Sequence, residues 1–199
     1  MPHKLDVWLF TEHVGSLELV NGRLSFSYVL NWLQSKNPKA LSCSLPLQAE
    51  PFEDVAARPF FSGLLPEGKM RQLIAQQLQV SGQNDFALLD HLGGECAGAV
   101  TFLKQGQRFP KQSQGHDIQW LTDKELVEIL DELPHRPMLA GRDGIRLSLA
   151  GAQDKLPVIF DGVRIGLPRN GASSSHILKP AIQSVEASVR NEGFCMALA

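Results

Sequence analysis

The sequence has few cysteines and no long apolar run. Its three cysteines, Cys43, Cys96 and Cys195, are far apart and odd in number, and no C-x-x-C pair occurs. This usage argues against a disulfide framework or a zinc knuckle and favours reduced thiols. No apolar stretch approaches the roughly 20 residues that cross a membrane, and the N-terminal segment lacks the pattern of a signal peptide. We therefore expect a cytoplasmic protein without a membrane partner.

A strong net charge is also missing. The chain of 199 residues carries 21 acidic and 19 basic side chains, and its formal net charge is −2. Nothing in this balance points to nucleic acid or an anionic membrane as the main partner. Hydrophobic residues make up 43% of the chain, which excludes disordered, collagen-like and coiled-coil classes and allows one large domain or two small ones.

Several short catalytic and binding signatures are absent. The sequence has no G-x-x-x-x-G-K-[ST] loop, no H-x-x-x-H pair and no G-x-S-x-G elbow. A P-loop, a histidine-paired metal site and an α/β-hydrolase nucleophile are therefore not indicated. The six histidines are scattered, and only His176 adjoins a candidate site.

Alternation of apolar and polar residues predicts a β-meander at the start of the chain. Asn21–Gly22 is a strong hairpin signal because both residues tolerate positive φ, and Gly15 is predicted to form the preceding turn. The predicted strands cover residues 7–9, 17–19, 24–28, 41–47, 98–103, 145–149, 156–160, 163–167 and 177–178.

Capping residues and helical periodicity predict four helices. Asn84 and Ser184 stand where N-caps are expected, and Thr122 with Glu125 forms a capping box. The apolar stretch 60–68 is predicted to form core and a turn, and contact with a partner is the alternative. The predicted helices cover residues 66–78, 85–92, 123–133 and 185–199.

The last predicted helix reaches Ala199 without a glycine, a basic last turn or a proline. Because helices usually carry such a stop signal, we expect a chain cut from a longer protein; a domain that ends in a frayed helix is the alternative. The polar residues after 104 mark a boundary. We predict a β-rich subdomain over 1–105, a linker and capped helix over 106–142, and a third part over 143–199.

The best candidate for chemistry is the stretch 146–155, R-L-S-L-A-G-A-Q-D-K. Gly151 lies between Ala150 and Ala152, so a loop here lets backbone amides approach a phosphate without obstruction by side chains. Ser148 and Lys155 add a hydroxyl and a positive charge. A simple β-hairpin with small residues at its bend is the alternative interpretation.

A second candidate follows in the stretch 171–180, where Lys179 stands at the end of a short predicted strand. Protein kinases hold the phosphates of ATP with such a strand lysine, and a glutamate on the next helix pairs with it. The helix predicted next carries Glu186 and Glu192. An exposed lysine that precedes Pro180 is the alternative.

The order and spacing of six motifs resemble the HipA family, the bacterial serine/threonine-protein kinase toxins of type II toxin–antitoxin modules. The resemblance covers essentially the whole chain and implies an α+β fold: a β-rich N-terminal subdomain with short helices, followed by the start of a protein-kinase-like N-lobe. The motifs are F-F-x-x-L-L-P at 60–66, D-F-A-L-L at 85–89, G-A-V-T at 98–101, S-L-A-G-A-Q-D-K at 148–155, H-I-L-K-P at 176–180 and N-E-x-F-C-x-x-L-A at 191–199.

The resemblance assigns roles to residues of this chain. Ser148 matches the regulatory phosphorylation site, and Lys179 matches the lysine that binds the ATP phosphates. Glu192 is a possible partner of that lysine. The residues that match the phosphate-binding loop are Ala150, Gly151, Ala152, Gln153 and Lys155.

The departure from the family concerns the catalytic half. The catalytic-loop aspartate and asparagine and the magnesium-binding aspartate of the family lie in a C-lobe that has no counterpart in these 199 residues. We therefore expect no catalytic or metal-binding residue here, and weak ATP binding by this chain alone. An intact relative would use ATP and magnesium to phosphorylate a serine of a translation-related target, of the aminoacyl-tRNA synthetase class.

The implied partners are a protein substrate and a DNA-binding antitoxin of the HipB type, with DNA contacted only through that antitoxin. A second hypothesis belongs to a different class of protein. Some members of the family are split, and the piece that matches the N-terminal subdomain then acts as a non-catalytic, antitoxin-like or docking module.

Overall fold

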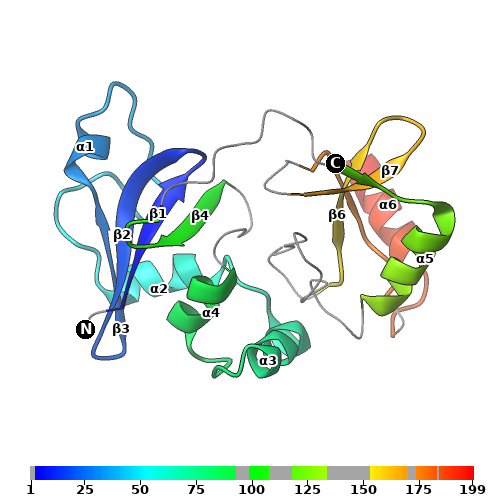
Figure 1. Cartoon of the computed structure of the whole chain (residues 1–199), viewed down its shortest axis with the longest axis horizontal. Helices are drawn as coiled ribbons and strands as arrows, with labels where there is room; N and C mark the ends of the chain where they lie inside the picture. Colours follow the sequence, from blue (N-terminus) through cyan, green and yellow to red (C-terminus); the bar gives the residue numbers. More distant parts are fainter. Residues whose placement is uncertain (1–2, 93–98, 108–117, 134–152, 170–173, 183) are drawn as a thin grey trace. The chain divides into compact units, whose positions relative to one another are not determined.

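A computed structural model describes residues 3–92, 99–107, 118–133, 153–169, 174–182 and 184–199. The chain divides into two compact units, one formed mainly by residues 1–110 and the other by 111–147 and 153–199 (Figure 1). Each unit holds one four-stranded antiparallel sheet together with helices, so the predicted α+β class is confirmed.

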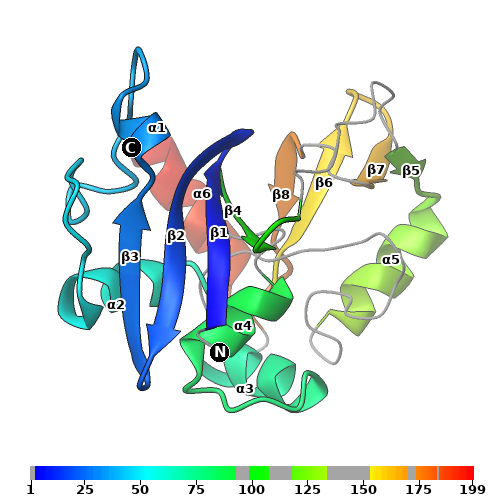
Figure 2. The same cartoon turned by 60° about the vertical axis from the view of Figure 1, so that its left-hand side comes forward.

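The sheet of the first unit is the predicted meander with one added strand (Figure 2). Its strands lie side by side in the order β3-β2-β1-β4, and every neighbouring pair is antiparallel. Asn21 and Gly22 form the β2–β3 turn with φ of 50° and 77°, which confirms the hairpin prediction. The strands are β1 (His3–Leu9), β2 (Glu12–Val20), β3 (Arg23–Tyr28) and β4 (Val100–Lys104).

Gly15 does not form a turn, and the prediction of one was wrong. It lies inside β2, and the chain turns at Phe10, whose φ is 54°. A Cβ on Gly15 would lie 2.5 Å from a ring carbon of Phe26 and 2.5 Å from the carbonyl oxygen of Ser27. The position requires glycine because the neighbouring strand and its aromatic ring approach the backbone closely.

The predicted strand at 41–47 is also absent, and an isolated bridge between Ser42 and Leu45 stands in its place. The Tyr28 hydroxyl holds this segment, because it donates to the carbonyl oxygen of Leu45 over 2.6 Å and accepts from the amide of Leu41 over 2.8 Å. Burial raises the pKa of Tyr28, and the hydrogen bond from Leu41 offsets this only in part. Only Leu45 of this segment is fully buried, so the alternation did not reflect a ladder.

The described part of the first unit also contains four helices: α1 (Leu30–Leu33), α2 (Asp54–Ser62), α3 (Gly68–Gln77) and α4 (Asp85–Leu92). The last two were predicted, and Asn84 caps α4 by accepting from the amide of Ala87 over 3.1 Å. The first two were missed; α2 includes Pro59 and carries Phe61 into the core. Phe61 lies against the rings of Phe26 and Phe102 at centroid distances of 5.3 and 5.7 Å.

A buried carboxylate joins three of these helices. Asp85 at the start of α4 is 5% exposed and accepts from Arg58 of α2, from Arg71 of α3 and from the hydroxyl of Ser62. Arg58 also pairs with Asp54, and this hydrogen bond lowers the pKa of Asp54. Asp85 is therefore the shared acceptor of a polar network that fixes α2, α3 and α4 to one another.

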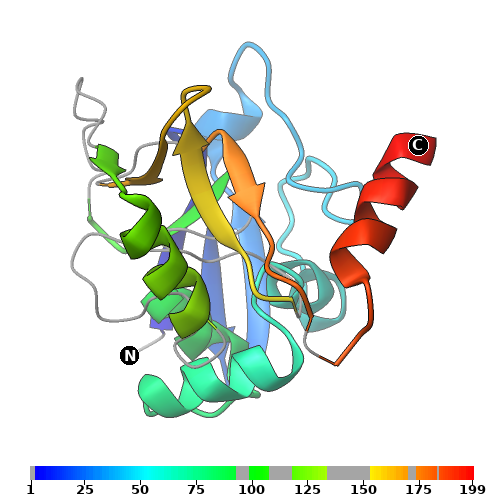
Figure 3. The ribbon, with the colours of Figure 1, turned by 90° about the vertical axis from the view of Figure 1, so that its right-hand side faces the viewer.

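The second unit holds a sheet in the order β5-β7-β6-β8 (Figure 3). β6 pairs with β7 on one side and with β8 on the other, both antiparallel. β5 was not predicted, whereas β6 begins and ends where the sequence indicated. The elements are β5 (Ile118–Trp120), α5 (Asp123–Glu132), β6 (Leu156–Phe160), β7 (Ile165–Pro168), β8 (His176–Leu178) and α6 (Ser188–Leu198).

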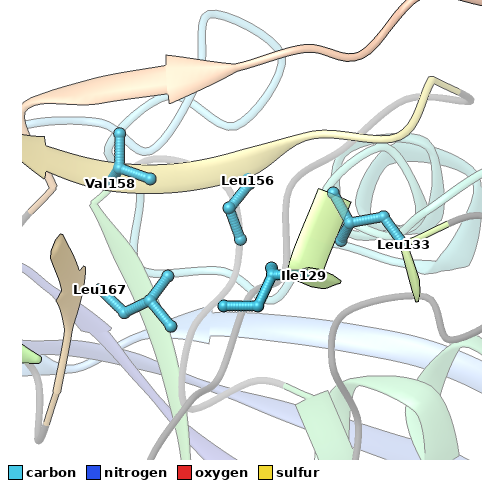
Figure 4. Packing of buried hydrophobic residues seen from close by; sticks show 5 residues of the cluster. All are labelled: Ile129, Leu133, Leu156, Val158 and Leu167. Carbon is cyan, nitrogen blue, oxygen red and sulfur yellow. The ribbon is translucent and has the colours of Figure 1, made fainter. Parts of the chain in front are cut away.

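Helix α5 covers one face of this sheet. The predicted capping box is confirmed, because the Thr122 hydroxyl accepts from the Glu125 amide and the Glu125 carboxylate accepts from the Thr122 amide. The helix packs its apolar side onto β6 and β7 (Figure 4), and Leu121, Leu126, Leu130, Ile165 and Leu178 lie around that core. The buried residues are Ile129, Leu133, Leu156, Val158 and Leu167.

Helix α6 begins later than predicted and is not capped by Ser184. Its N-cap is Ala187, with φ of 53°, and just before it the Val185 amide donates to the carbonyl oxygen of Ile182 over 3.0 Å. No residue of α6 is buried. Among the described residues, no helix is both long and apolar enough to cross a membrane.

Candidate functional site

The predicted site residues fall into two groups. Ser148, Ala150, Gly151 and Ala152 lie outside the described residues, together with the strand predicted at 145–149. The other four are described, and all belong to the second unit: Gln153, Lys155, Lys179 and Glu192.

The ladder between β6 and β8 brings the two lysines to one end of the sheet. Leu156 is paired with Leu178, and the antiparallel register continued by one residue sets Lys155 opposite Lys179. Residues directly opposite in such a pair have Cβ atoms about 5 Å apart. Two cationic side chains that come from well-separated parts of the sequence thus share one edge of the unit, which is an arrangement suited to an anion.

An ion pair joins this edge to the last helix. The Nζ atom of Lys179 donates to Oε1 of Glu192 on α6, and the two side chains are 37% and 40% exposed. An ion pair this accessible contributes only about 0–1 kcal/mol to stability. The pair therefore adds little to the stability of the fold, but it sets the Glu192 carboxylate beside the lysine ammonium group.

Lys179 points away from the helix-covered core. Leu178 packs against the cluster formed by α5, β6 and β7, and successive side chains of an extended segment alternate between faces. Alternation therefore places Lys179 on the face opposite α5, where it meets α6. His176 shares the face of Leu178; its ring lies edge-on to Phe160 at 5.6 Å and its Nδ1 atom is 2.9 Å from the Ser175 hydroxyl.

The structure adds two contacts that no sequence signal indicated. The Nε2 group of Gln153 donates to the carbonyl oxygen of Pro180 over 3.3 Å. The hydroxyl of Ser188, in the first turn of α6, accepts from the amide of Ile182 over 2.9 Å. The segment that follows Lys179 is therefore hydrogen-bonded to Gln153, which lies close to Lys155, and to α6, the helix that carries Glu192.

Within the described part of the chain, no group of three or more histidine, cysteine, aspartate or glutamate side chains is placed to hold a metal ion. The described site therefore supplies cations and hydrogen-bond donors rather than a carboxylate cluster.

The fold defines a two-unit α+β protein with an antiparallel sheet in each unit and a lysine–glutamate pair in the second. Comparison with known proteins then identifies the family. The model of the HipA N-terminal domain matches residues 5–103. The chain is 46% identical over 198 residues to a protein of Sinorhizobium fredii with the name "Putative kinase Y4mE". The chain belongs to the HipA family and corresponds to its N-terminal portion.

A second relative is the serine/threonine-protein kinase toxin HipA of Shewanella oneidensis, which is 30% identical over 196 residues. A chain of the solved complex of that organism's toxin–antitoxin system, HipA, HipB and its operator DNA, superposes with a TM-score of 0.71 at 27% identity. Both matches include 94% of the present chain. They include only 43% of the Shewanella HipA sequence and 42% of the HipA chain in the solved complex, and the match to Y4mE includes 47% of that protein. The chain thus spans less than half of these relatives.

A shorter relative differs in this respect. An uncharacterised protein of Haemophilus influenzae is 29% identical over 105 residues, which make up 51% of this chain and 92% of that protein. A segment about half as long as this chain therefore occurs as nearly the whole of another protein.

Proposed function

We propose that this chain forms the nucleotide-facing N-terminal portion of an ATP-dependent serine/threonine-protein kinase toxin. The observation that carries the proposal is the Lys179–Glu192 ion pair just after β8, opposite the position of Lys155, which directly precedes β6. Protein kinases need such a strand-lysine and helix-glutamate pair in place for activity, because the lysine then meets the phosphates of ATP. The second unit would be the start of a kinase-like N-lobe.

The residues of this chain fit one part of that task. Lys179 and Lys155 would neutralise phosphate charge, and the predicted loop at 150–153 would offer backbone amides. The described residues offer no carboxylate cluster for magnesium, so metal binding and the catalytic loop would come from the rest of the kinase. The whole enzyme would join the γ-phosphate to a serine hydroxyl of a target of the aminoacyl-tRNA synthetase class, releasing ADP. Phosphorylation of Ser148 would then add about two negative charges to the loop and weaken nucleotide binding.

The proposed partner is a DNA-binding antitoxin of the HipB type. Support comes from the structural neighbour, which was solved with HipB and operator DNA, and from the near-neutral charge of this chain, which gives no reason for direct DNA contact.

Replacing Lys179 by alanine tests the kinase proposal. We expect weak binding of Mg-ATP to the 199-residue chain and a further loss of about tenfold or more in Lys179→Ala, because charge-assisted bonds to phosphate are lost. Lys4→Ala is the control, since Lys4 forms a comparably exposed ion pair with Glu18 in the other unit. Titration calorimetry gives both affinities. Equal affinities of Lys179→Ala and the unchanged chain would refute the assignment.

A second candidate function is a non-catalytic binding module, favoured by the short relative from Haemophilus influenzae. In this role the chain would bind a HipB-type antitoxin or a HipA kinase without binding nucleotide. Size-exclusion chromatography of the chain mixed with each partner separates the two candidates. Co-elution together with no Mg-ATP heat would favour the module, and Mg-ATP heat that depends on Lys179 would favour the kinase portion.

A further inference from the structure

We propose that Gln153 is a positioning residue for Lys179, acting through the main chain of Pro180 rather than by touching nucleotide itself. The inference rests on the proposed function only for the identity of the ligand of Lys179. The contact that supports it, between Gln153 and Pro180, does not depend on any ligand. Family resemblance placed Gln153 among the phosphate-loop residues, whereas its side-chain amide donates to Pro180.

The end of β8 needs such a tie. β8 has three residues and lies at the edge of its sheet, with β6 as its neighbour. Its last paired residue is Leu178, and Lys179 comes directly after it. Pro180 cannot donate a further hydrogen bond to the ladder, because proline has no backbone N–H. A lysine just beyond a short edge strand would otherwise be free to fray.

Gln153 supplies the missing bond from the β6 side. Its Nε2 group lies 3.3 Å from the carbonyl oxygen of Pro180, so the chain is held on both sides of Lys179, by the ladder at Leu178 and by Gln153 at Pro180. Pro180 also biases the residue before it toward extended backbone. The backbone of Lys179 is thereby restricted at three successive residues.

The side chain of Lys179 is held from a different element. Glu192 of α6 accepts from its ammonium group, and Ser188 of the same helix accepts from the amide of Ile182. The exposed ion pair is too weak to fix the lysine alone, since such pairs contribute about 0–1 kcal/mol. Backbone restraint from Gln153 and side-chain restraint from Glu192 act together to place one ammonium group.

The test uses Gln153→Ala and Gln153→Glu in the 199-residue chain. The second variant keeps the shape of the side chain but replaces the donating amide by an acceptor. Gln119→Glu is the charge-matched control, because Gln119 lies in the same sheet and its side-chain oxygen accepts from Arg169, a role that glutamate retains. Two readouts are independent of nucleotide: hydrogen exchange at the amides of Lys179 and Ala181, and the labelling rate of the Lys179 amine by mass spectrometry.

Loss of one neutral hydrogen bond should speed exchange and labelling by about fivefold in both Gln153 variants and leave the control unchanged. Exchange at Val158 and Leu167 should not change. Unchanged rates at Lys179 and Ala181 in both variants would overturn the proposal, as would a rise that extends to Val158 and Leu167, because that would show a general loss of fold.

Mg-ATP affinity is measured on the same variants. A loss of about fivefold in both, with the control unaffected, shows that the restraint serves the nucleotide site. Absence of Mg-ATP binding in the unchanged chain would count against the kinase proposal alone, while the exchange and labelling rates still decide whether Gln153 positions Lys179.

Discussion

Replacing Asp85 by alanine should destabilise the first unit by about 3 kcal/mol or more, because it leaves two arginines without their shared, buried partner. The carboxylate is 5% exposed, and Arg58 and Arg71 reach it from different helices. Breaking a buried pair from one side costs more than the pair contributes, since Arg71, whose side chain is only 17% exposed, loses the carboxylate that neutralises it, while Arg58 keeps its pair with Asp54. The loss should loosen α2, α3 and α4 together.

Asp90→Ala is the matched control. It removes a carboxylate from the same helix, but Asp90 is partly exposed and lies 3.6 Å from Lys104, whose side chain is 63% exposed. Such a pair contributes about 0–1 kcal/mol, so a small effect is expected. Hydrogen exchange under increasing denaturant, followed at peptides of each unit, gives the two free energies. An Asp85→Ala effect no larger than that of Asp90→Ala would show that the network does not hold the helices.

The second unit should be unaffected by Asp85→Ala under the same conditions. Asp85 belongs to a core with its own sheet, and the core around Leu156 forms within the other unit. Exchange at peptides of β6 and β7 is the measurement, and parallel destabilisation of both units would contradict this independence.

Local signals in the sequence predicted those elements that depend on neighbours along the chain. The Asn21–Gly22 hairpin and the Thr122–Glu125 capping box are contacts within a few residues, and both are confirmed. Helix α2 was missed because Pro59 lies inside it, and an internal proline normally marks the end of a helix; the helix buries Phe61 against other aromatic rings, a contact with distant residues.

Gly15 shows the opposite failure. Glycine is the usual residue of turns, and that local meaning predicted a turn here. Its actual role is to leave room for the ring of Phe26, which approaches from the neighbouring strand. A steric requirement set by another strand leaves no trace in the residues beside Gly15, so sequence reasoning could not identify it.

In the candidate site, too, some features could be predicted from local sequence and others depend on contacts between distant residues. The order of a strand lysine and a helix glutamate is a sequence pattern, and the structure joins Lys179 to Glu192. The choice of Glu192 over Glu186 depends on where α6 begins, and the predicted cap at Ser184 was wrong by several residues. The bond from Gln153 to Pro180 spans 27 positions and follows only from the β6–β8 register.

Leu156 belongs to the core of the second unit and also to the end of the ladder beside the candidate site. Its replacement by alanine should destabilise the second unit by about 2–5 kcal/mol. Leu156 on β6 is fully buried against α5, and its truncation would leave a cavity among the closely packed side chains around it. It adjoins Lys155 and is paired with Leu178, so its loss should weaken the end of the ladder from which Lys179 extends.

Leu198→Ala is the control for Leu156→Ala, because Leu198 is 72% exposed and a substitution there should change stability by no more than about 0.5 kcal/mol. Denaturant-dependent hydrogen exchange at β6 gives the free energy, and the labelling rate of the Lys179 amine shows whether the ammonium group is released. Loss of stability without faster labelling would show that Glu192 and Gln153 hold Lys179 independently of the core. Faster labelling in proportion to the lost stability would show that the core of α5, β6 and β7 is what places the lysine.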